Sequence, residues 1–148
     1  MRTIETIRQP VTVPADQTIQ QAAQLMETSS VGALLVVDDD ERLVGIVTDR
    51  DIVRRGVAAG LDPDARVDAV MSCPAVTIDA QSDLRDAFAM FREHAVRRLP
   101  VVDDGRPTGM LTVDDLIVGL VNELNDVVRP ITAELLFGHH DPSVPATM

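Results

Sequence analysis

Two short segments of the sequence carry residues that could bind a polar, anionic small molecule. Both read glycine, two apolar residues, threonine, two variable residues and aspartate, from Gly45 to Asp51 and again from Gly109 to Asp115. An aspartate carboxylate can accept hydrogen bonds from two hydroxyl groups at once, and a helix N-terminus attracts an anion. Threonine and aspartate at this spacing also form a capping box at a helix start. The pattern is therefore expected with a ligand or without one.

This motif belongs to a longer internal repeat, so the elements that position it are duplicated as well. The stretch "VTVPADQ" returns as "VTIDAQS", with Thr12 matched by Thr77, 65 residues later. Gly45 is matched by Gly109, 64 residues later, and the one-residue slip falls in the turn after the aspartates. Self-similarity of this length indicates duplication of one supersecondary unit.

Each repeat is predicted to run strand, helix, strand, strand, helix. In repeat one the spacing of apolar residues predicts these elements at 11–13, 18–28, 33–37, 43–48 and 49–59. In repeat two it predicts a helix at 83–94, strands at 99–102 and 108–111, and a helix at 113–125. Thr18 with Gln21 predicts a capping box, Gly60 a helix C-terminus, and Asp104-Gly105 a tight hairpin turn. Pro130 is expected to break the last helix.

The predicted fold class is α+β, with two β-α-β-β-α repeats packed sheet to sheet and related by pseudo-twofold symmetry. One repeat offers a three-stranded sheet with two helices on one face, and its core is small for an independent domain. The predicted boundaries are repeat one with its lead-in at 1–60, a linker at 61–74, repeat two at 75–127 and a partly disordered extension at 128–148. Packing the copies together creates two equivalent clefts between them.

Composition excludes several functions. The net charge is −11, which disfavours binding to nucleic acids and to anionic membranes. All 13 basic residues are arginine, so the chain can form neither a lysine Schiff base nor a P-loop. Cys73 is the single cysteine, and His139-His140 alone is a weak metal signal, so no metal site is predicted. With no nucleophile elbow, signal peptide or membrane-length apolar run, we expect a cytoplasmic protein that is not an enzyme.

At these residues the chain resembles the CBS (cystathionine-β-synthase) domain family, over about residues 4–121. "VTVPADQTIQQA", "LLVVDD", "GIVTDRD" and "VRRLPVVDD" are typical of that family in wording and order. The phrase "GIVTDRDIVRRGVAAGLDP" is similar to small bacterial stand-alone CBS pairs, including mycobacterial hypoxic-response proteins. The resemblance implies a regulatory module that binds an adenosine-containing ligand (AMP, ADP or ATP) between its repeats and requires no cofactor.

The resemblance also implies roles for individual residues. Asp51 and Asp115 would accept hydrogen bonds from the ribose hydroxyls, and Thr48 and Thr112 would contact phosphate. The segments that line the two clefts would contribute a further set of residues: Thr12, Ala33, Gly45, Thr77 and Gly109. The two glycines could let a ligand approach the backbone closely.

The two copies differ where repeat two has Arg97-Arg98 and repeat one has Gly32-Ala33. Family members often place a basic residue here against phosphate, so both arginines are candidate phosphate contacts. Neighbouring residues of a strand face opposite ways, so we expect one of the two to enter a cleft. The alternative is that they form surface salt bridges with Asp or Glu.

Two functions remain open from the sequence. The first is a sensor that forms a homodimer, a disc of four repeats joined by the helices after each motif, and signals in trans to an unknown effector protein. The second is a stress-related scaffold or interaction protein whose clefts hold no ligand, with the motif residues kept as helix caps.

Overall fold

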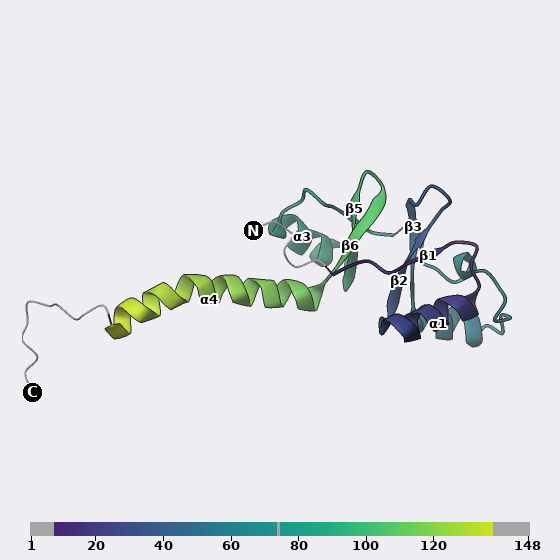
Figure 1. Ribbon diagram of the computed structural model, residues 1–148, viewed down its shortest axis with the longest axis horizontal. Coiled ribbons are helices and arrows are strands. Elements are labelled where there is room, and N and C mark those ends of the chain that lie inside the picture. Colours follow the sequence, from purple (N-terminus) through teal and green to yellow (C-terminus); the bar gives the residue numbers. More distant parts are fainter. Residues whose placement is uncertain (1–7, 74, 138–148) are drawn as a thin grey trace, which may run out of the picture.

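The computed structural model describes residues 8–73 and 75–137. Repeat one consists of β1 (Thr12–Pro14), α1 (Ile19–Ser29), β2 (Ala33–Val37), β3 (Leu43–Thr48) and α2 (Asp49–Asp51), which continues into the π-helix η2 (Ile52–Val57). A short 3₁₀ helix, η3 (Val67–Ala69), lies in the linker. Repeat two consists of β4 (Ile78–Asp79), α3 (Leu84–His94), β5 (Arg98–Asp103), β6 (Arg106–Thr112) and α4 (Val113–Phe137). The predicted α+β class and element order are confirmed (Figure 1).

Both repeats build the same three-stranded mixed sheet. β1 pairs parallel with β2, and β2 pairs antiparallel with β3; β4, β5 and β6 repeat this order. A register shift falls between Val36 and Val37 in one sheet and between Val101 and Val102 in the other. The duplication therefore extends to the β-bulge, a local feature that hydrophobic patterning does not specify.

The predicted helix cap, hairpin turn and helix C-terminus have the hydrogen bonds and backbone angles that these features need. Gln21 N donates to Thr18 Oγ1 and Thr18 N donates to Gln21 Oε1, both at 3.0 Å, which completes the predicted capping box. Asp104 and Gly105 have φ of 51° and 77°, as a tight two-residue hairpin turn needs. Gly60, the predicted helix C-terminus, also has a positive φ, of 75°.

The core is aliphatic and divides between the repeats. One cluster surrounds Leu34 and Val47, and the other surrounds Leu99 and Leu111, all with no exposed surface. Phe91 adds an aromatic side chain to the second cluster. Burying each large aliphatic side chain contributes about 1.5–3 kcal/mol, so these positions hold each sheet to its helices.

Reciprocal contacts between the hairpins join the two repeats. Arg42 Nη1 donates to Asp104 O at 3.1 Å, and Arg106 Nε donates to Asp40 O at 3.4 Å. Arg42 and Arg106 are matched positions of the two copies, and Asp40 and Asp104 both lie in the hairpin turn that precedes them. Exchange of the same contact in both directions is the signature of the expected pseudo-twofold axis, and Figure 1 shows the two hairpins side by side.

The segments before each repeat also cross to the other one. Arg8 forms two backbone hydrogen bonds with Met110 of β6, both 3.1 Å long. Ser72 forms the matching pair with Ile46 of β3, at 2.8 and 3.1 Å. Met110 and Ile46 are equivalent in the two motifs, so Arg8 and Ser72 occupy equivalent places beside them.

Two helices differ from their predictions. Residues 52–57 form a π-helix, where a regular helix was expected over 49–59. The prediction that Pro130 breaks the last helix is wrong, because α4 runs through it to Phe137. A proline removes one backbone hydrogen bond, while the helical spacing of apolar residues continues past it at Ile131 and Leu135. The tail with His139-His140 lies outside the described residues.

Candidate functional site

The motif of repeat two places its aspartate beside the lead-in to repeat one. Thr112 precedes α4, and its Oγ1 accepts a hydrogen bond from Asp115 N at 3.1 Å. The Asp115 carboxylate accepts two hydrogen bonds from Arg8, from Nε to Oδ2 and from Nη2 to Oδ1, both 2.9 Å. The Arg8 side chain is 72% exposed and that of Asp115 is 15% exposed. Hydrogen bonding and then charge attraction from Asp115 raise the pKa of the Arg8 guanidinium above its usual value.

The motif of repeat one uses its aspartate differently. Thr48 Oγ1 accepts from Asp51 N at 3.1 Å, and Asp51 Oδ2 accepts from Thr48 N at 3.0 Å. This is a complete capping box, in which the carboxylate bonds to the backbone of its own motif. The two aspartates are therefore equivalent in sequence but not in their partners.

The reason for this difference lies in the segments that precede the repeats. Arg8 and Ser72 stand at equivalent places, each bridged to the strand that leads into the other repeat's motif. An arginine is long enough to reach the motif carboxylate from that place, whereas a serine is not. Sequence reasoning missed Arg8, because it lies before the first matched residue of the repeat.

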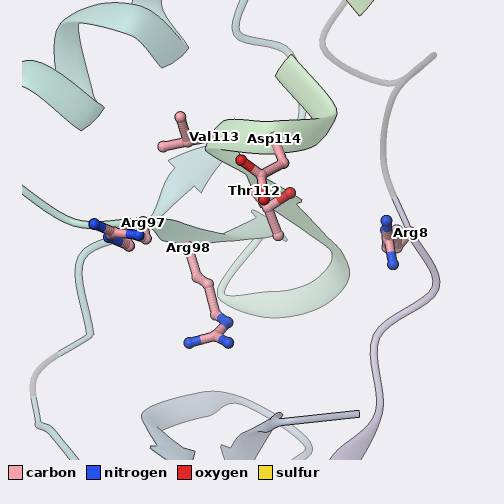
Figure 2. A pocket seen from close by; sticks show the side chains of 6 residues that line it. All are labelled: Arg8, Arg97, Arg98, Thr112, Val113 and Asp114. Atoms are coloured by element: carbon pink, nitrogen blue, oxygen red, sulfur yellow. The ribbon is translucent and has the colours of Figure 1, made fainter. Parts of the chain in front are cut away.

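Two cavities meet at the repeat-two motif. The larger, of about 570 Å³, is lined by side chains from the lead-in, the start of β5 and the residue before it, the end of β6 and the start of α4: Arg8, Arg97, Arg98, Thr112, Val113 and Asp114 (Figure 2). The smaller, of about 210 Å³, lies between the repeats and shares Arg8, Arg98 and Thr112 with the larger. It adds Ala33 and Gly32 from repeat one. Cationic side chains from two distant segments thus meet at a helix N-terminus, which suits an anion.

The two predicted arginines point in different directions. Figure 2 shows Arg98 reaching from the start of β5 toward repeat one, whereas Arg97 points to the side, away from Arg8. Arg98 Nη2 lies 3.6 Å from the position that a Cβ on Gly32 would occupy. Arg98 lines both cavities and Arg97 lines only the larger one. Neither forms an ion pair within the described part of the chain, unlike Arg8.

The other predicted cleft residues are spread over both repeats. Ala33 lines the smaller cavity, Thr12 is exposed on β1 opposite Leu35, and Thr77 directly precedes β4. Gly109 is buried in β6 opposite Val101.

Gly45 serves the chain's own packing. A Cβ at this position would lie 2.6 Å from Met71 Sδ and 2.8 Å from Ser72 O, so the glycine admits the linker that crosses β3. The sequence predicts that Gly45 lets a ligand approach the backbone closely. In the structure, the Met71 side chain and the Ser72 backbone of the linker make the close approach.

Across residues 8–73 and 75–137, no three His, Cys, Asp or Glu side chains gather where they could hold a metal ion. Within the same residues, no helix is both long and apolar enough to cross a membrane.

Comparison with known proteins agrees with this architecture. The model of the CBS domain matches residues 2–58 and 67–122. Hypoxic response protein 1 of Mycobacterium tuberculosis is 39% identical over 68% of this chain and 71% of its own. The CBS domain-containing protein YhcV of Bacillus subtilis is 42% identical over 74% of this chain and 78% of its own.

A crystal structure of Hypoxic Response Protein I with two coordinated zinc ions superimposes with a TM-score of 0.71 at 35% identity, covering 79% of this chain and 97% of that one. The chain belongs to the CBS-domain family, as a tandem pair of its repeats.

Proposed function

We propose that this CBS pair is a cytoplasmic regulatory module that binds an adenosine nucleotide between its repeats and signals in trans to a partner protein. The observation that carries the proposal is the joined cavity at the repeat-two motif. There, three arginines and the N-terminus of α4 surround one space on a chain of net charge −11. Concentrating positive charge at one place on an acidic surface favours a phosphorylated ligand.

In this proposal each motif residue has a defined contact. The Asp51 and Asp115 carboxylates accept hydrogen bonds from ribose hydroxyls, and Thr48 and Thr112 bind phosphate with the N–H groups that follow them. Arg98 and Arg97 neutralise the remaining phosphate charge. Ala33 and the apolar residues near it contact the adenine ring.

The proposed assembly is a homodimer of two such pairs, joined by the helices that follow the motifs. Apolar side chains are unusually exposed on these helices: Val53 by 58% and Val57 by 72% on η2, and Val118 by 58% and Val121 by 47% on α4. Exposed apolar residues clustered on helices mark an interaction surface. A second copy of the chain would cover them in a disc of four repeats.

One observation favours the second candidate, a scaffold without ligand. The Thr48–Asp51 capping box is complete without any bound molecule, so these residues stabilise the chain by themselves. The two functions differ in whether any nucleotide raises the stability of the folded protein.

Thermal unfolding with AMP, ADP, ATP, NAD and S-adenosylmethionine separates them. A ligand present at 100 times its Kd stabilises the folded state by about 2.7 kcal/mol, which raises Tm by roughly 5–10 °C for a chain of this size. We expect such a shift with an adenine nucleotide, and a smaller shift for Asp115→Asn. No shift with any of the five compounds would favour the scaffold.

A further inference from the structure

The proposed ribose acceptor of repeat two is already occupied by a side chain of the protein. Arg8 holds both carboxylate oxygens of Asp115 at 2.9 Å. A ligand that offers only hydroxyl groups must displace this guanidinium and leave it without an anionic partner. Such a ligand therefore loses one charge-assisted interaction for the one it gains.

A phosphorylated ligand can avoid that loss. Arg8 lines the same cavity as Arg98 and Thr112, the proposed phosphate contacts. Its side chain is 72% exposed, so it can turn from the carboxylate toward a phosphate without disturbing the core. The exchange keeps Arg8 paired with an anion and frees Asp115 for the ribose.

The charges around the cavity favour this exchange. Among the residues that the structure describes, its lining carries three arginines and one acidic residue, Asp114. Once a phosphate replaces Asp115 as the partner of Arg8, the guanidinium groups of Arg8 and Arg98 face the ligand, and Arg97 lines the side of the same cavity. A triphosphate matches this charge better than a monophosphate does.

The repeat-one motif has no such arrangement. Ser72 takes the place of Arg8 there, and Asp51 bonds to the backbone of Thr48. The dependence on phosphate charge therefore belongs to the repeat-two cleft.

We propose that Arg8 is a specificity-determining residue of the repeat-two cleft, exchanging the Asp115 carboxylate for the phosphate groups of a bound nucleotide. This inference rests on the proposed nucleotide-binding function. It adds to the binding site a residue that lies outside the repeat. It also predicts that the affinity of the cleft rises with the number of phosphates on the ligand.

Calorimetric titration of the full chain at constant ionic strength tests the exchange. The ligands are adenosine, ATP and inorganic triphosphate, and the variants are Arg8→Ala and Arg85→Ala. Arg85 is an exposed arginine on α3, so its loss changes the net charge equally without touching the cavity or the proposed dimer helices. Thermal unfolding confirms that each variant is folded.

Arg8→Ala is expected to change the binding affinity in opposite directions for ATP and for adenosine. Arg8→Ala weakens ATP and triphosphate binding by about tenfold, the effect of one charge-assisted hydrogen bond. The same variant binds adenosine more tightly than the wild type, because Asp115 is free. Arg85→Ala matches the wild type with all three ligands.

Other outcomes overturn the inference or separate it from the proposed function. Equal weakening of adenosine and ATP by Arg8→Ala, or no change with either, contradicts the exchange. If nothing containing adenosine binds, the proposed function fails. Triphosphate binding that depends on Arg8 would then still support the anion site, and triphosphate binding that is absent or independent of Arg8 would contradict it.

Discussion

Arg8 and Asp115 form a bidentate ion pair across 107 positions of the sequence, with both N–O distances at 2.9 Å. The pair fastens the lead-in of repeat one to the start of α4 in repeat two. At the equivalent place, Ser72 leaves Asp51 to close its own capping box. The two motifs match in sequence, but their aspartates have different hydrogen-bond partners because different residues of the crossing segments lie beside them.

Arg98 is expected to matter more for nucleotide binding than Arg97. Arg98 lines both cavities and reaches toward Gly32, whereas Arg97 lines only the larger cavity and points to the side. Titration of ATP into Arg98→Ala should show a loss of about tenfold or more, and Arg97→Ala a smaller loss. A larger loss for Arg97→Ala would mean that the phosphates lie outside the interrepeat cavity.

Thr48→Ala should lower the free energy of unfolding by about 0.5–2 kcal/mol, because Asp51 N loses its acceptor at the helix start. Thr48→Ser keeps a hydroxyl at the same place and serves as the control. Urea unfolding measures both. If the alanine and serine variants are equally stable, the hydroxyl is not acting as a cap in solution.

Gly45→Ala should destabilise the protein by about 1–3 kcal/mol, because the new Cβ would collide with Met71 and Ser72 of the linker. Gly56→Ala is the matched control. Its Cβ would meet Ile19 at an ordinary 3.7 Å, and alanine favours a helix by up to about 1 kcal/mol. Equal effects of the two substitutions in urea unfolding would contradict the close crossing of the linker over β3.

Val57→Asp and Val121→Asp should convert the proposed dimer to a monomer, since each places a charge among apolar side chains that a second copy would cover. Gln81→Asp adds the same charge at an exposed position away from these helices. Sedimentation equilibrium gives the mass of each variant. A wild-type monomer, or a dimer that survives both valine substitutions, would show that these faces do not join two copies.

The repeated architecture could be predicted because short-range sequence patterns in both repeats specify its helices, strands and turns. Thr18 with Gln21 specifies a helix start, and Asp104-Gly105 specifies a hairpin turn, through interactions within a few residues. The apolar runs around Leu34 and Leu99 mark buried strands in the same way. Such features depend on neighbours in the sequence and need no knowledge of the tertiary fold.

The remaining features depend on contacts between distant segments. Arg8 could not be assigned to the site, because its partner is known only once the lead-in is placed against β6. The role of Gly45 likewise depends on the linker that crosses it. Pro130 misled the local prediction, since the lost hydrogen bond did not end α4.

A crystal structure of the protein grown with saturating ATP tests the central claim most directly. The account predicts density for the nucleotide at the repeat-two motif, with ribose hydroxyls on Asp115 and phosphates on Arg98. It also predicts that Arg8 has turned from Asp115 to the phosphates. A cavity without nucleotide, in which Arg8 still holds both oxygens of Asp115, would contradict it.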